Sequence, residues 1–79
     1  MPKEGKMELF RFIEKSPQAG QVIRLYSDNG EIVTCSESCY KTLFLVLENQ
    51  VFYCIGGCKS VKNFTQEELE KMSWSVLET

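Results

Sequence analysis

Apolar runs separated by turn residues fill the middle of the chain, residues 21–64. An Asn-Gly pair at 29–30 lies between two such runs, and both residue types tolerate the positive φ that a tight hairpin turn requires. The polar stretch 48–50 and the double glycine at 56–57 supply two further breaks. The pattern therefore predicts an antiparallel meander of five strands across residues 21–64.

The run at residues 42–47 is apolar at almost every position, which is typical of a central strand covered on both faces. The run at 51–55 has the same character, and the one at 60–64 is shorter and more polar. The core predicted from these runs consists of Ile23, Leu25, Val33, Leu43, Leu45, Leu47, Phe52 and Ile55.

The segment before the meander, residues 7–15, spaces its apolar side chains three and four apart. Leu9 and Ile13 would share one face of a helix, so the spacing predicts a short N-terminal helix. Alternation of Phe10 and Phe12 around a polar residue leaves a strand as the alternative. Pro17 disfavours helix at the residue before it and ends the segment.

The segment after the meander, residues 65–79, begins with a helix start signal. Thr65 followed three residues later by Glu68 forms the pattern of a capping box, which predicts a C-terminal helix. Residues 73–77 then alternate, and indicate either a short terminal strand or a continuation of the helix.

Length and charge restrict the class of protein. The 79 residues form one domain, 1–79, whose small core is marginal. The net charge of −2 lacks the basic excess that is typical of nucleic-acid-binding domains, although a local basic patch is compatible with it. No stretch is long and apolar enough to cross a membrane, and no signal region is present. We therefore expect a cytoplasmic protein whose thiols stay reduced.

The four cysteines occur as two Cys-x3-Cys pairs, Cys35 with Cys39 and Cys54 with Cys58. The first interpretation is four reduced thiols that pack as small apolar residues, with no metal or cofactor. A zinc site with four cysteine ligands is an alternative, although zinc knuckles usually have a spacing of two residues. Disulfides are the third, for example between Cys35 and Cys54. Because the chain has no histidine, a thiolate–imidazole pair is excluded, and no other catalytic pattern indicates an enzyme.

The order of these motifs resembles the Sm and LSm family of small β-barrels, including its bacterial Hfq branch. The first signature of that family is similar to VIRLY at 22–26, the Asn-Gly turn, and LVLEN at 45–49. The second is similar to IGGCKSV at 55–61. The resemblance implies a five-stranded, strongly bent antiparallel barrel at 21–64 with a short N-terminal helix, and it leaves residues 65–79 outside as an extension.

The family also implies a homo-oligomeric ring that binds single-stranded RNA. The residues that the resemblance assigns to RNA are Tyr40, Lys41, Thr42, Phe44, Ile55, Gly56, Gly57 and Lys59. The fourth strand of one subunit would pair with the fifth of the next, which assigns the oligomer interface to Val51, Tyr53 and Val61. The apolar strand around Phe44 indicates the core as its alternative position, and the lysines alternatively form solvated surface.

Four positions depart from the family pattern. Cys35 stands where the family has a glycine, Lys41 where it has an aspartate, Phe44 where it has a base-contacting asparagine, and Gly56 where it has an arginine. The resemblance therefore implies weaker or altered base specificity. Two alternatives follow: a barrel that serves as a protein-interaction scaffold without RNA, and a small zinc-binding regulatory module. A chain so small and so divergent would suit a phage or mobile-element origin.

Overall fold

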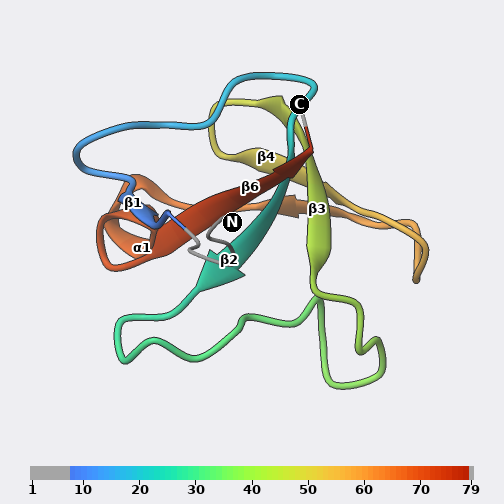
Figure 1. Ribbon diagram of the computed structural model, residues 1–79. Helices are drawn as coiled ribbons and strands as arrows, with labels where there is room; N and C mark the ends of the chain where they lie inside the picture. The colour runs from blue at the N-terminus through green and yellow to red at the C-terminus, as the bar shows by residue number, and fades with distance from the viewer. Residues whose placement is uncertain (1–7, 79) are drawn as a thin grey trace, which may run out of the picture.

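A computed structural model of the chain describes residues 8–78 and shows an antiparallel six-stranded sheet with one short helix (Figure 1). The elements are β1 (Phe10–Arg11), β2 (Val22–Tyr26), β3 (Leu43–Glu48), β4 (Val51–Cys54), β5 (Val61–Asn63), α1 (Gln66–Glu70) and β6 (Ser73–Glu78). The strands lie side by side in the order β1-β6-β2-β3-β4-β5. The protein is therefore mainly β, as expected. The sheet has six strands instead of five, and within the described residues it is not closed.

The core lies on one face of the curved sheet. Ile23 of β2 pairs with Phe44 of β3, and Phe44 pairs with Cys54 of β4, so three fully buried side chains form a row across the sheet. Trp74 of β6 covers the end of this core, with its ring 4.8 Å from that of Phe10. These contacts join residues from both ends of the chain, so the core includes segments outside 21–64.

The inward-facing set of β3 differs from the prediction. Phe44 and Val46 point into the core, while Leu43 and Leu45 are half-buried and Leu47 is 42% exposed. Both faces of this strand carry apolar side chains, so the sequence pattern cannot show which face is buried. The pairing of β3 with β2 and β4 determines which face points into the core. The remaining predicted positions divide as follows: Ile23, Leu25 and Phe52 are buried as predicted, and Val33 and Ile55 are half-buried.

The predicted N-terminal helix is wrong. Phe10–Arg11 is a two-residue strand paired with β6, and residues 12–14 form a turn in which the N–H of Lys15 donates to the carbonyl of Arg11. A helix of nine residues is too short to be stable without tertiary support, whereas β6 offers Phe10 a ladder partner and an aromatic contact. Met7, the first residue of the expected helix, lies outside the described residues.

The Asn-Gly hairpin turn forms, but the strand expected after it does not. Gly30 has a φ of +88°, and the N–H of Ser27 donates to the carbonyl of Glu31. After a single bridge between Tyr26 and Ile32, the chain leaves the sheet and runs as a loop over residues 33–42. β3 therefore pairs directly with β2. The strand that was expected between them in the five-strand meander is absent from the described residues, and the loop over residues 33–42 takes its place.

The C-terminal segment is part of the sheet. The capping box forms as predicted, because the N–H of Glu68 donates to Thr65 Oγ1 and the N–H of Thr65 donates to Glu68 Oε1. β6 then pairs with β2 along the edge that β3 does not use. Both edges of β2 are therefore occupied, and β5 stays at the end of the sheet and does not close it into a barrel. The indole N–H of Trp74 donates to the carbonyl of Lys15 at 2.8 Å. The alternative of a terminal strand at 73–77 is thus confirmed, and this part of the segment that the resemblance left outside the barrel forms an interior strand between β1 and β2.

Candidate metal centre

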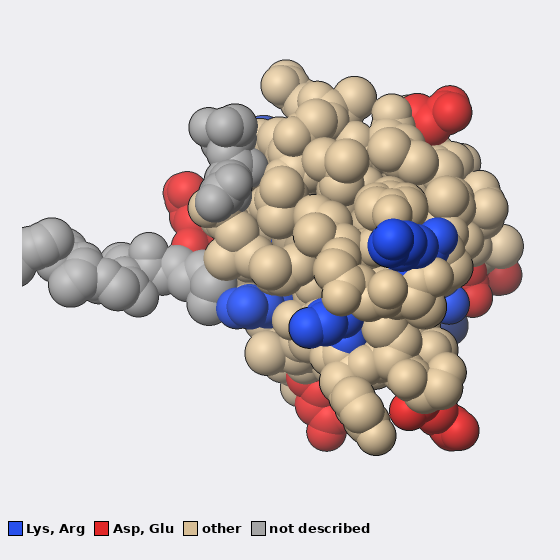
Figure 2. Space-filling model, turned by 90° about the vertical axis from the view of Figure 1, so that its right-hand side faces the viewer, with Lys and Arg blue, Asp and Glu red and all other residues tan. Residues whose placement is uncertain are grey.

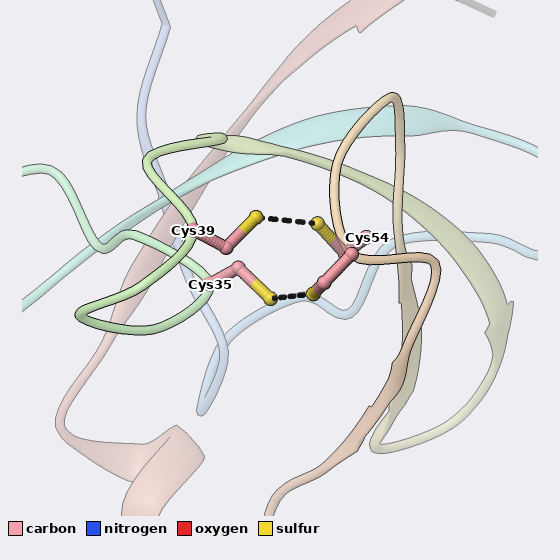
Figure 3. Close-up of side chains that lie close together, drawn as sticks. Cys35, Cys39 and Cys54 are labelled. Atoms are coloured by element: carbon pink, nitrogen blue, oxygen red, sulfur yellow. Dashed lines mark hydrogen bonds between the residues drawn. The ribbon is translucent and has the colours of Figure 1, made fainter.

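Two loops bring the four cysteines together. The loop between β2 and β3 carries Cys35 and Cys39, and the turn between β4 and β5 carries Cys58, with Cys54 at the end of β4. Figure 3 shows Cys35 and Cys39 pointing from one loop toward the other, where Cys54 points back at Cys39. All four Sγ atoms lie within 4.8 Å of one another, so residues 23 positions apart in sequence share one small volume.

The sulfur separations match those around one tetrahedral ion. Cys35 Sγ lies 3.2 Å from Cys58 Sγ, and Cys39 Sγ lies 3.7 Å from Cys54 Sγ. Four thiolates at about 2.3 Å from zinc would be about 3.8 Å from one another in a tetrahedron. The cluster therefore has the size of a single-ion site.

Backbone hydrogen bonds hold the first loop in place. The N–H of Cys35 donates to the carbonyl of Lys41, and Ser36 and Cys39 exchange two backbone hydrogen bonds. These bonds fold residues 35–41 into a tight loop whose two sulfurs face the same side. Because the loop is shaped by its own backbone, the spacing of three residues between its cysteines is compatible with a shared site.

The second loop depends on Gly57. An added Cβ on this residue would lie 2.5 Å from Cys39 Sγ, 2.6 Å from Lys41 Cγ and 3.1 Å from Cys54 Sγ. The backbone of the second loop thus passes directly against two of the sulfurs and against the first loop. Glycine is required here for space, and its neighbour Gly56 takes the positive φ of +75° that turns the chain.

Ser60 lies beside the cluster and was not singled out from the sequence. Its Oγ is 2.9 Å from Cys58 Sγ and 3.6 Å from Cys35 Sγ, so it can donate a hydrogen bond to a thiolate. Its carbonyl also accepts the N–H of Cys54. Hydrogen bonds of this kind orient metal ligands and tune them. A serine two residues after a cysteine carries no sequence signal that would have identified this role.

The thiols differ in acidity. Burial raises the pKa of Cys54 to about 12, with neighbouring cysteines adding to the effect. The hydrogen bond from Ser60, followed by one from Cys35, lowers the pKa of the exposed Cys58 to about 6. The cluster therefore combines an ionised sulfur at neutral pH with a buried sulfur whose negative charge needs a cation beside it.

The residues assigned to RNA from the resemblance divide into two groups. Phe44 is fully buried, in the alternative position that the apolar strand indicated. The others lie on the same two loops as the cysteines or next to them. Tyr40 is 82% exposed, Lys41, Gly56 and Lys59 are exposed, and Thr42, Ile55 and Gly57 are half-buried. The close approach of Gly57 to Lys41 brings the two loops together.

The residues assigned to the oligomer interface lie at one end of the sheet. Tyr53 of β4 pairs with Val61 of β5, and Val51 pairs with Asn63. Val61 is 48% exposed, and Val51 and Tyr53 are half-buried. Within the described residues β5 has no second neighbour in the sheet, so its outer edge faces away from the domain.

Among the described residues, no helix has the length and apolar character needed to span a membrane. No family model matches the chain, and no curated protein or solved structure is significantly similar to it. The resemblance to the Sm family thus rests on the quoted motifs, and the cysteine cluster rests on its own geometry.

Proposed function

We propose that the protein is a small, non-enzymatic zinc-binding domain in which Cys35, Cys39, Cys54 and Cys58 hold one structural ion. The observation that carries the proposal is the convergence of four sulfurs within 4.8 Å from two separate loops. A tetrahedral set of four thiolates selects zinc or iron among the common metals, and zinc is the usual ion of isolated structural sites.

The composition of the site supports a structural role. Four protein ligands complete a tetrahedron, whereas catalytic zinc sites keep one position for water or substrate. Three of the four cysteines are buried, which limits access of a substrate to the ion. The ion would therefore stabilise the fold and would not perform chemistry.

A structural ion also suits the size of the domain. A chain of 79 residues has a marginal core, and metal binding adds directly to the free energy of folding. The loop over residues 33–42 has few backbone bonds to the sheet, and the ion would attach it to the β4–β5 turn. A reducing compartment, as in the cytoplasm, would keep the thiols available as ligands.

The test is metal analysis of the purified protein after expression with zinc and with iron supplied in excess. We expect one zinc per chain, a thermal midpoint that falls on chelation, and loss of the metal in Cys39→Ser. The exposed neighbour Ser38 provides the control, because Ser38→Ala should keep the ion. Protein that refolds fully without metal and retains no zinc after reconstitution would overturn the proposal.

A second proposal is that the two cysteine loops bind single-stranded RNA, as the Sm resemblance implies. The observation in its favour is that Lys41 and Gly57 pack together, so the loops that would contact RNA form one surface with Tyr40 exposed beside it. Figure 2 views the side of the molecule on which β3 lies, and shows Lys and Arg on its middle with Asp and Glu toward its margins. An exposed ring stacks on bases, and lysines neutralise phosphates.

RNA binding is tested by titration of a mixed-sequence single-stranded RNA at several salt concentrations. The affinity should fall steeply with salt, and Lys41→Glu should weaken it without unfolding the domain. Lys71, at the end of α1, is the control, since Lys71→Glu makes the same charge change outside residues 35–42 and 54–60. Absence of binding by the wild-type protein at low salt would leave a scaffold role in place of RNA binding.

A third proposal is self-association through the outer edge of β5. The contact that the Sm resemblance implies, β4 of one subunit with β5 of the next, is not available, because β4 already pairs with β3 and with β5 of its own chain. The free edge of β5 and the exposed side chain of Val61 support this proposal, whereas Val51 and Tyr53 already pair with β5 inside the chain. Light scattering should then return a multiple of the chain mass, and Val61→Lys should reduce it. Ile32, also 48% exposed but far along the sheet from β5, is the control for the same substitution. A monomer at high micromolar concentration would contradict self-association.

A further inference from the structure

We propose that the cysteine cluster is also a site of oxidation, at which a hydroperoxide converts the four thiols into two disulfides, Cys35–Cys58 and Cys39–Cys54. The proposal deepens the zinc assignment and rests on it for one consequence, the release of the ion. The identity of the two disulfides rests on the sulfur geometry alone.

The geometry selects the partners. The contacts at 3.2 Å and 3.7 Å each join one sulfur of the β2–β3 loop to one of the β4–β5 segment. A disulfide needs about 2.05 Å between its sulfurs, so each pair closes by less than about 2 Å. In Figure 3 the labelled Cys39 and Cys54 face each other across the gap between the loops, and a second dashed line runs beside theirs from the labelled Cys35. Two parallel bonds across that gap need no exchange of partners.

Access determines where the reaction begins. Cys58 is exposed, while Cys35, Cys39 and Cys54 are buried. The sulfur of Cys58 attacks one peroxide oxygen, the O–O bond breaks, and sulfenic acid and water form. Cys35 Sγ, at 3.2 Å, then attacks the oxidised sulfur and displaces a second water. Two thiols are oxidised by two electrons, and one hydrogen peroxide is reduced to two waters.

The second pair, Cys39 and Cys54, consumes a second peroxide by the same steps. Disulfide sulfurs carry no negative charge and bind zinc poorly, so the ion leaves as Zn²⁺. For the whole site, four zinc-bound thiolates, two hydrogen peroxides and four protons give two disulfides, four waters and one Zn²⁺. The oxidant is thus the only co-reactant besides protons from solvent.

The consequence for the fold is that the same two loops remain connected. Zinc links the β2–β3 loop to the β4–β5 turn, and so do both disulfides. The bonds close segments with sequence separations of 23 and 15 residues, long enough to restrict the unfolded chain substantially. Oxidation would therefore exchange one connection for another, while the reduced chain without metal would lose both.

Trypsin provides a sharp test, because it cleaves after Arg24, Lys41 and Lys59. Peptide 25–41 then carries the two cysteines of the first loop, and peptide 42–59 carries the other two, so either proposed disulfide joins the two peptides. Zinc-bound protein is treated with hydrogen peroxide in small excess, and zinc release is followed with a chromophoric chelator. We expect release of the ion, a mass decrease of four hydrogens, and one joined peptide after digestion without reductant. Separate peptides with disulfides inside each loop, or sulfinic acid at Cys58 with no disulfide, would overturn the proposal.

Partner choice is resolved with two double variants studied in the absence of metal. Cys39→Ser with Cys54→Ser keeps the closer pair Cys35 and Cys58 and should form a disulfide rapidly with peroxide. Cys35→Ser with Cys54→Ser keeps Cys58, where the reaction begins, with Cys39 in place of Cys35, and should react more slowly. Equal rates would refute the pairing. If the wild-type protein binds no zinc yet forms the joined peptide, the zinc proposal fails and the oxidation site stands. If it binds zinc and forms no joined peptide, only the oxidation site fails.

Discussion

Substitution of Gly57 by alanine tests the packing of the metal centre most directly. The new methyl group would lie 2.5 Å from Cys39 Sγ and 2.6 Å from Lys41 Cγ, against an ordinary contact distance of 3.4–4 Å. Both neighbours must move by about 1 Å, and one of them is a proposed zinc ligand. The φ of Gly57 is not in the left-handed region, so backbone strain adds nothing to this effect.

Overpacking of this kind costs roughly 1–3 kcal/mol. If the cost falls on the zinc-bound state, the affinity for zinc decreases by about 5- to 150-fold, because each 1.4 kcal/mol corresponds to about a factor of ten. Competition with a chromophoric chelator measures this ratio. Cobalt in place of zinc gives a second readout, since its visible bands report distortion of a tetrahedral thiolate site.

Gly30→Ala is the matched control for the same chemical change. Gly30 has a positive φ of +88° and no atom within 4 Å of an added Cβ, and it lies in the hairpin turn after β2. Its substitution should lower stability by about 1–2 kcal/mol through backbone strain and leave the affinity for zinc unchanged. Wild-type zinc affinity in Gly57→Ala would refute the packing argument, as would an equal loss of affinity in Gly30→Ala.

Three further outcomes follow from the structure. Ser60→Ala removes the hydrogen bond to Cys58 and should lower zinc affinity by about 10- to 100-fold in a chelator competition, and unchanged affinity would show that Ser60 does not support the site. In the reduced, metal-free protein, Cys58 should react first with iodoacetamide at pH 7, because it is exposed and its lowered pKa of about 6 leaves it mainly ionised. The rate of its alkylation should drop as the pH falls below 6. First labelling at a buried cysteine would contradict this expectation. Phe44→Ala should cost about 3–5 kcal/mol in denaturant unfolding and Leu47→Ala less than about 1 kcal/mol, the reverse of what the predicted core implies for Leu47.

Local signals in the sequence were sufficient for the turns, the cap and most strand positions. The Asn-Gly turn, the capping box of Thr65 and the strands near 42–47 and 51–55 all formed close to their predicted places. Each depends on residues within a few positions of one another. Positive φ at Gly30 and a side-chain oxygen at Thr65 act locally, so neighbouring residues are enough to predict them.

Tertiary structure decided the N-terminal segment, the place of β6 and the orientation of β3. Residues 8–15 satisfy helical spacing and strand alternation about equally, and pairing of Phe10 with Trp74, distant in sequence, selects the strand. β3 is apolar on both faces, so only its register with Ile23 and Cys54 places Phe44 inside. Periodicity reports a preference for one face of an element, and it is silent where both faces are apolar or the element is short.

The candidate metal centre shows the same division. The sequence supplied four cysteines in two pairs with an unusual spacing, which left reduced thiols, zinc and disulfides all open. Their convergence depends on the loop over residues 33–42 folding back against the β4–β5 turn, with Gly57 admitting Cys39 and Ser60 placed beside Cys58. Distances between loops are set by the sheet that carries them, so the type of ligand could be read from the chain, while its arrangement around one point required the fold.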